Sequence, residues 1–276
     1  MNTAAQRLCA WSGIICIVVF FVGFWLVAGF IPPPPPTLTG EELAQLFTGH
    51  AVRIRLGMII SLLASALLAS WSAAITAQMM RMKKRVAALA YTNLAVGALF
   101  VLEFIISLII WESMTFRPRD PQVLLAMNDT AWLLFVAITS TPILQTLSIG
   151  TAIFLDTADN PNPVLPRWAG YLNFWIAMLF LPGSITVFFH TGPFAWNGIL
   201  VWYLPLTAFA VWMVVMSAMV LRAIAAEDAQ QSPATADADL AAQLRDLRFE
   251  VARLADRKDV ARWPTAIRCS AHGADR

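Results

Sequence analysis

Charged residues are scarce in this chain. Only 13% of its 276 residues are Asp, Glu, Lys or Arg, whereas 59% are hydrophobic. A soluble domain is about 25% charged and about 45–50% apolar, so this composition cannot cover a water-exposed surface of that size. The formal net charge of +2 argues against the strong basic field by which nucleic-acid-binding proteins attract phosphates.

Cysteine and histidine are also sparse, which limits the chemistry. The three cysteines (Cys9, Cys16 and Cys269) make no disulfide framework, because a helix would hold the first two about 10 Å apart, beyond bridging reach. Of the three histidines, only His50 and His190 lie in the hydrophobic part. A pair of haems would need four axial histidines, so a single haem held by both residues is the only haem alternative. We predict no cofactor and no metal site.

Catalytic motifs are missing as well. The sequence contains no HExxH zinc motif, no glycine-rich phosphate loop and no cluster of cysteine with histidine. Gly183-Ser184 lacks the flanking glycines of an elbow nucleophile. An enzyme is therefore the least favoured class of function.

Long apolar runs take up most of the chain. Each is close to the length of about 17–25 residues that a helix needs to cross a bilayer, and none alternates with the period of two typical of a strand. The runs cover residues 11–31, 56–80, 86–111, 130–155, 168–190 and 199–221. Because only helices and closed barrels span lipid, they predict an all-α polytopic membrane protein, with six transmembrane helices in one bundle over residues 1–222.

Basic residues indicate the orientation of this bundle. The segment RMKKR at 81–85 holds four basic residues in five positions, and short cytoplasmic loops carry such an excess. With this loop inside, an even number of spans places both termini inside, so we predict a multi-pass protein of the bacterial cytoplasmic membrane. Aromatic residues near the ends of the runs are interpreted as interfacial belts. They are Trp111, Trp132, Trp196, Trp202 and Tyr203 on the outer side, with Trp11 and Trp168 on the inner side.

Three local patterns predict how the helices pack. Thr39 and Glu42 have the spacing of a capping box, and the apolar face of the short helix that follows predicts that it lies on the membrane surface. Small residues recur every fourth position in the second run, a spacing that lets helices approach closely in lipid. They are Gly57, Ser61, Ser65, Ala69, Ala73 and Ala77. Kinks are expected at Pro142, at Pro182 with Gly183, and at Pro205.

Glu103 is the acidic residue that lies well inside a run. An intramembrane carboxylate is a functional-site candidate by default, and the structural alternative is an ion pair or a hydrogen-bonded acid. We predict Arg55 as its partner. The predicted site is an outward-facing polar pocket formed by Glu103, Arg55, Arg53, His190, His50 and Asn197. The alternative is that these side chains reach the lipid headgroups without converging.

The C-terminal part changes character. We predict a polar linker at 223–236, an amphipathic cytoplasmic helix at 237–260 and a disordered tail at 261–276. The apolar positions of the helix alternate at spacings of four and three over about two heptads, which leaves open subunit pairing, a place on the inner leaflet, or an exposed helix. These positions are Leu240, Leu244, Leu247, Val251 and Leu254.

Three stretches carry a resemblance: RIRLGM at 53–58, PRWAGYLNFW at 166–175 and FFHTGPFAWNG at 188–198. With them the chain resembles an uncharacterised family of six-span bacterial integral membrane proteins over roughly residues 10–224. The resemblance implies fold and topology and transfers no catalytic residue.

The first functional hypothesis is a non-enzymatic membrane protein that binds or passes a small molecule or ion near Glu103. The alternative is a structural or assembly subunit that acts through helix–helix contacts, as a homo-oligomer or with a membrane partner. The lipid bilayer is the predicted environment in both cases, and no nucleic-acid partner is expected.

Overall fold

The structure is a computed structural model that describes residues 3–82 and 86–260, and over these residues it contains helices and no strands. The predicted all-α class is confirmed. The chain forms two compact units, Met1–Ala225 and Ala226–Arg276. The first unit holds the apolar helices and is described first.

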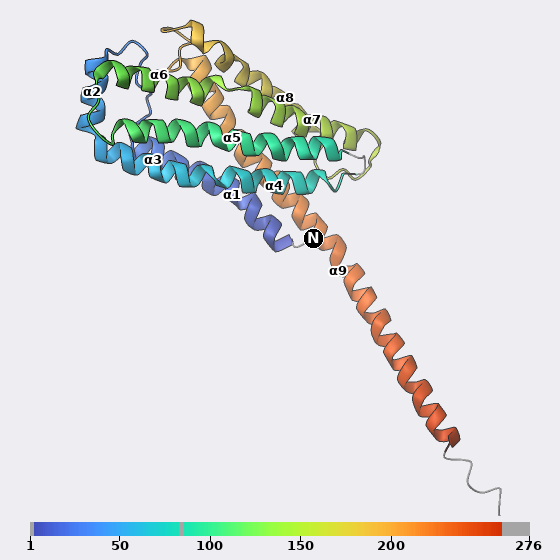
Figure 1. The fold of residues 1–276 in the computed structure, drawn as a ribbon. Coiled ribbons are helices and arrows are strands. Elements are labelled where there is room, and N and C mark those ends of the chain that lie inside the picture. Colours follow the sequence, from blue (N-terminus) through green and yellow to red (C-terminus); the bar gives the residue numbers. More distant parts are fainter. Residues whose placement is uncertain (1–2, 83–85, 261–276) are drawn as a thin grey trace, which may run out of the picture. The chain divides into compact units, whose positions relative to one another are not determined.

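Six helical segments are long and apolar enough to cross a membrane, as predicted. They are Thr3–Val27, Ala51–Met79, Ala87–Met114, Pro121–Asp159, Arg167–Phe188 and Ile199–Ala229. Several are composite. Their elements are α1 (Thr3–Phe21) with the π-helical η1 (Val22–Val27), α3 (Ala51–Ser65) with α4 (Leu67–Met79), α5 (Ala87–Met114), α6 (Pro121–Ala137) with α7 (Ser140–Asp159), α8 (Arg167–Phe180) with the 3-10 helix η2 (Leu181–Phe188), and the π-helical η3 (Ile199–Tyr203) leading into α9 (Leu204–Val260) (Figure 1).

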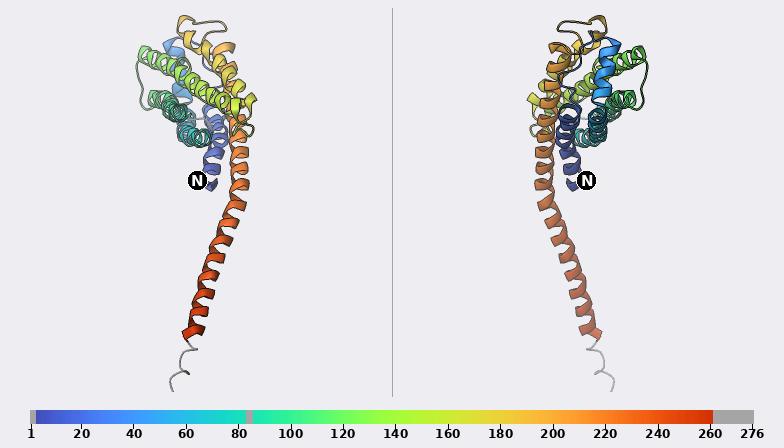
Figure 2. Two further views of the ribbon diagram at one scale, coloured as in Figure 1. Left: turned by 90° about the vertical axis from the view of Figure 1, so that its right-hand side faces the viewer. Right: turned by 90° about the vertical axis from the view of Figure 1, so that its left-hand side faces the viewer.

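The bundle has two ends that we name after their contents. At the Arg81 end, Gln78 donates a hydrogen bond to Gln6 at 2.5 Å and Arg81 donates to the Ala223 carbonyl at 3.2 Å, so the start of α1, the end of α4 and the sixth span meet. Figure 2 shows α1 beside the part of α9 that belongs to this unit. The other end carries the short helix α2 (Gly40–Gly49), and we name it the α2 end.

Helix α2 begins as the sequence predicts. The Thr39 hydroxyl accepts from the backbone N–H of Glu42, and the Glu42 carboxylate accepts from the backbone N–H of Thr39 at 2.8 Å, which completes the capping box. These bonds hold the pKa of Glu42 below its usual range. The apolar face of α2 packs against the protein, because Leu43 and Phe47 are buried in the aromatic cluster described below and Gly40 lies against Pro121 of α6.

The predicted stripe of small residues is correct for one half of the second span. Gly57, Ser61 and Ser65 are buried, and the Ser61 hydroxyl contacts the Phe20 carbonyl at 3.2 Å. Ala69 and Ala73 are exposed. A tight turn at Ala66, whose carbonyl accepts from Ala69 three residues later, overwinds the helix there, so that the buried face of α4 no longer continues the series of small residues. In α4 the buried positions are larger, with Trp71 and Ile75 among them.

The outer tryptophans do not form the predicted belt. Trp111, Trp132, Trp196 and Trp202 are all at most 5% exposed. They form an aromatic cluster with Phe24, in which Trp111 and Trp132 have ring centroids 4.8 Å apart and Trp132 and Trp202 5.2 Å. A buried edge-to-face pair adds about 0.5–1.5 kcal/mol beyond area burial, so these rings are core residues of the α2 end. Exposed Trp11, Trp168 and Tyr203 remain compatible with interfacial positions.

The C-terminal unit consists, where the structure describes it, of the last part of α9. Residues 223–236, which the sequence predicts as a polar linker, are helical, and the boundary between the units falls at Ala225. Leu244 and Leu247 of the predicted seam are 52% and 57% exposed. The side chains of Leu240, Val251 and Leu254, and all of the predicted tail 261–276, lie outside the described residues.

Close backbone contact between η1 and α3 gives a test of the fold. A Cβ atom on Gly57 would lie 2.5 Å from the Gly23 carbonyl oxygen, so Gly57→Ala must separate the two helices. We expect it to destabilise the protein by about 1–3 kcal/mol. The matched control is Gly49→Ala at the end of α2, where a Cβ would meet nothing within 4 Å. Reversible unfolding in SDS, followed by tryptophan fluorescence, measures both, and equal stability of the two variants would contradict the packing.

Candidate functional site

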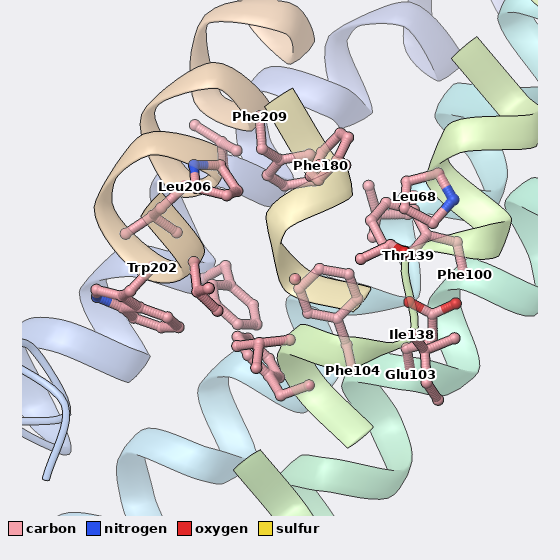
Figure 3. A pocket seen from close by; sticks show the side chains of 18 of the residues that line it. Leu68, Phe100, Glu103, Phe104, Ile138, Thr139, Phe180, Trp202, Leu206 and Phe209 are labelled. Carbon is pink, nitrogen blue, oxygen red and sulfur yellow. The ribbon is translucent and has the colours of Figure 1, made fainter. Parts of the chain in front are cut away.

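A cavity occupies the centre of the bundle (Figure 3). Together with its open mouth it comprises about 780 Å³ of space free of atoms. Every one of the six spans lines it. One lining residue from each span, in chain order, is Phe20, Leu68, Glu103, Thr139, Phe180 and Phe209. The cavity is therefore a product of the whole bundle and not of one helix pair.

A break in the fourth span forms one wall of the cavity. Helix α6 ends at Ala137 and α7 begins at Ser140, with Ile138 at φ −77° and ψ 83°, outside helical geometry. Pro142 explains the position, since proline has no N–H to donate and is tolerated only in the first turn of a helix, where it now lies. The kink that the sequence predicts at Pro142 is thus a full interruption, one turn before the proline.

The fifth span meets this break with a second irregular segment. Helix α8 gives way at Leu181 to η2, whose second and third residues are Pro182 and Gly183. The hydroxyls of Thr139 and Ser184 share a hydrogen bond. A Cβ on Gly183 would collide with the Val136 carbonyl, so only glycine allows η2 to approach the break. Pro205 in turn lies just after η3, as the second residue of α9.

Glu103 is the one acidic side chain in the lining. It is 6% exposed, and its carboxyl oxygen Oε1 accepts a hydrogen bond from the Thr141 hydroxyl. The nearby Ser107 hydroxyl donates to the main-chain carbonyl of Glu103, at 2.8 Å, and not to the carboxyl group. Among the described residues no donor reaches the second oxygen, Oε2. Because Thr141 lies in the first turn of α7, the positive end of that helix dipole faces the carboxyl group.

Aromatic rings surround the carboxyl group. Phe100 and Phe104, three residues before and one after Glu103, have ring centroids 5.1 Å apart. Phe104 lies 5.2 Å from Phe135 and 5.3 Å from Phe20, and Phe100 lies 5.7 Å from Phe209. In Figure 3 the carboxyl group lies beside Ile138 and Thr139, with the Phe104 ring next to it. The cavity is therefore apolar and aromatic with a carboxyl group on one side.

The predicted polar pocket is not formed. Of its six residues only Glu103 lines the cavity. Arg55, the predicted partner, donates instead to Thr115 at the end of α5, with 3.0 Å between Nε and the hydroxyl oxygen. Arg53 donates to the Val27 carbonyl at 3.2 Å. Both arginines extend from the first turn of α3, where they tie neighbouring segments of the α2 end together.

The remaining members of that pocket lie at the surface. His50, between α2 and α3, and His190, after η2, are exposed, and Asn197 is half-buried in the loop before η3. His190 interacts electrostatically with Asp129 of α6. Neither histidine lines the cavity, and in the described chain no group of three or more His, Cys, Asp or Glu side chains could hold a metal ion.

Sequence reasoning missed the aromatic lining and the role of Thr141. The signal for the first was present in the pattern Phe100-x-x-Glu103-Phe104, which places two rings beside the buried carboxyl group. Thr141 directly precedes Pro142, and its hydroxyl donates a hydrogen bond to the glutamate.

A separate polar network lies deeper toward the Arg81 end. The Asn93 amide donates to Thr76 at 2.8 Å and to the Ser72 carbonyl at 3.2 Å, while the Gln145 amide donates to Ser72 at 2.9 Å and to Asn93 at 3.2 Å. A Cβ on Gly97 would collide with Ser72, so a glycine is needed for this contact. The network joins α4, α5 and α7 through the amide nitrogens of Asn93 and Gln145, whereas the Gln145 amide oxygen is buried without a partner among the described residues.

This network predicts a stability effect. Asn93→Ala removes hydrogen bonds to two helices and leaves Gln145 with one partner, so we expect a loss of about 1–2 kcal/mol in SDS unfolding. The control is Thr92→Ala, whose hydroxyl bonds only to the Ala88 carbonyl of its own helix. If both variants unfold at the same SDS concentration as the unchanged protein, the network does not hold the helices together.

Comparison with known proteins adds no relative. The chain matches no protein-family model, no curated protein and no solved structure.

Proposed function

We propose that this protein binds a lipophilic small molecule in the cavity at the centre of its membrane bundle, with Glu103 as the polar contact. The observation that carries the proposal is the free oxygen of Glu103 in a cavity lined by all six spans. Aromatic and aliphatic side chains around few polar groups are the usual lining of a small-molecule site. An inorganic ion is less suited, because such a lining offers too few oxygen ligands to replace its water.

The balance of energies supports a role for Glu103 beyond stability. A charged side chain at the centre of a span costs about 2.5–3.5 kcal/mol on insertion scales. One hydrogen bond between helices in lipid returns about 1–2 kcal/mol at most. The Thr141 hydroxyl alone therefore does not offset the cost of the charged form of Glu103, and a bound ligand that pairs with Oε2 would stabilise that form.

The orientation is part of the same proposal. RMKKR at 81–85 joins the second and third spans, and positive charges of this density favour the cytoplasmic side. Both ends of the membrane unit and the C-terminal helix are then cytoplasmic, in the cytoplasmic membrane of a bacterium. The α2 end faces outward.

Labelling of engineered cysteines tests the orientation. We expect Lys84→Cys to react with a membrane-impermeant maleimide only after the cells are permeabilised. Arg119→Cys, in the exposed loop between α5 and α6, serves as the matched control and is expected to react in intact cells. The reverse pattern would invert the topology.

An assembly subunit is the second candidate. The observations in its favour are the exposed small residues Ala69 and Ala73 on α4 and the exposed Leu244 and Leu247 on the C-terminal helix. Such surfaces suit helix–helix contacts. A subunit of this kind needs no ligand in the cavity, so the next experiment separates the two functions.

Cys16 provides a direct probe of the cavity, because its buried thiol is free and lines it. With Cys9→Ser and Cys269→Ser, Cys16 is the only thiol. We expect the neutral fluorophore N-phenyl-1-naphthylamine to slow alkylation of Cys16 by N-ethylmaleimide at least fivefold in nanodiscs, because it occupies the same space.

The control for this experiment is a thiol facing outward from the same helix turn. Ile15 is 45% exposed, so Ile15→Cys with Cys16→Ser reports only on partition of the fluorophore into lipid. Binding is supported if Cys16 alone is protected. Equal protection at both positions, or no protection of Cys16 by this fluorophore or by the charged probes described below, would refute it and favour the subunit.

A further inference from the structure

The cavity also has a charge preference, and it points to a class of ligand. Its lining includes one carboxyl group and, among the described residues that form it, no lysine, arginine or histidine. The two arginines of α3 are engaged elsewhere, since Arg55 bonds to Thr115 and Arg53 to Val27. Within the cavity, the positive end of the α7 dipole is the single feature of opposite sign.

The rings around Glu103 add to this preference. Phe100, Phe104, Phe20, Phe135 and Phe209 form a continuous set with neighbouring centroids 5.1 to 5.7 Å apart. The π-face of an aromatic ring is negative, and it attracts a cation held within about 6 Å of the centroid. The attraction strengthens where the effective dielectric constant is low, as beside the mainly apolar lining of this cavity.

We infer that the ligand of this cavity is a lipophilic cation, such as a hydrophobic amine or another onium ion, whose positive charge pairs with Glu103 among the phenylalanine rings. This inference rests on the proposed function and names its ligand class. An anion would face the carboxyl group and the rings without a countercharge. A small metal ion would need several oxygen ligands, whereas the lining provides the Glu103 carboxyl group and the Thr139 hydroxyl.

The cost of removing a charge from water also favours a lipophilic cation as the ligand. Burial of two charges in a medium of low dielectric constant is repaid only if both lose little hydration or pair closely. A bulky onium ion spreads its charge and is weakly hydrated, and its apolar body fills the remaining cavity. Transfer from water into the cavity therefore lowers the free energy of such an ion, whereas a compact ammonium or alkali ion would lose more hydration energy than it recovers.

The Cys16 assay tests this inference with probes of matched shape. Tetraphenylphosphonium and tetraphenylborate have nearly the same size and opposite charge. We expect tetraphenylphosphonium to protect Cys16 and tetraphenylborate to leave it unprotected, each judged against the Ile15→Cys control. Protection by the borate at similar concentrations would overturn the charge preference.

Substitution at Glu103 locates the source of the preference. In Glu103→Gln we expect the phosphonium concentration for half protection to rise at least tenfold, while N-phenyl-1-naphthylamine still protects Cys16. Glu103→Asp keeps the charge and should keep phosphonium protection, which guards against a folding defect in the amide variant. Phe104→Leu should weaken the phosphonium by about threefold and leave the neutral probe unchanged.

The outcomes separate the inference from the proposed function. If the neutral probe protects Cys16 and the phosphonium does not, or if Glu103→Gln leaves phosphonium protection unaltered, the cavity binds ligands without a preference for cations and the inference is wrong. If no probe protects Cys16 in the unchanged cavity, the binding function itself is wrong.

Discussion

Polar groups inside a membrane must find their partners within the protein, and this constraint accounts for much of the bundle. Non-helical backbone at membrane depth is tolerated only where it is buried in protein or lines a cavity. The break at Ile138 and Thr139 meets both conditions, since the two residues line the central cavity and Thr139 bonds to Ser184. The same constraint draws Asn93 and Gln145 together on neighbouring helices.

Contacts between aromatic rings, more than hydrogen bonds, hold the α2 end of the bundle together. The indole N–H groups of Trp111, Trp132 and Trp202 are buried and have no acceptor among the described residues, whereas Trp196 donates to the Pro34 carbonyl at 2.9 Å. Ring contacts and not hydrogen bonds therefore place three of these four tryptophans. Since lipid is as apolar as a leucine side chain, close contact between large rigid rings is an effective way to hold this end of the bundle together.

The sequence predicts the number of spans correctly, but it predicts poorly which side of each span faces the protein. Both results have the same physical reason. A span is recognised by a run of apolar residues, and each of the six runs is long enough to cross a membrane as a helix. Its lipid side and its protein side are both apolar, so periodicity carries little information about rotation. The sequence predicts Trp132 at the membrane–water interface, but its side chain is buried in the protein. It predicts Ala69 on a helix-packing face, but this residue is exposed.

The sequence predicts a hydrogen-bond pattern at a helix end correctly, but it does not predict a contact between two spans. The capping box of Thr39 and Glu42 depends on four neighbouring residues, and it is present in the structure. The partner of Glu103 depends on how two spans are rotated and shifted. The sequence therefore predicts Arg55 as the partner of Glu103, whereas the structure places Thr141 there, 38 residues away.

The irregular segments are arranged around the cavity. The break in the fourth span, η2 and η3 supply Thr139, Gly183 and Val201 to its lining. α-Helical segments supply most of the remaining wall. Segments with 3-10 or π geometry occur often at functional sites, and their hydrogen bonds are weaker or fewer. The three irregular segments therefore meet at one cavity, and the break among them is set by Pro142, which lies in the first turn of α7.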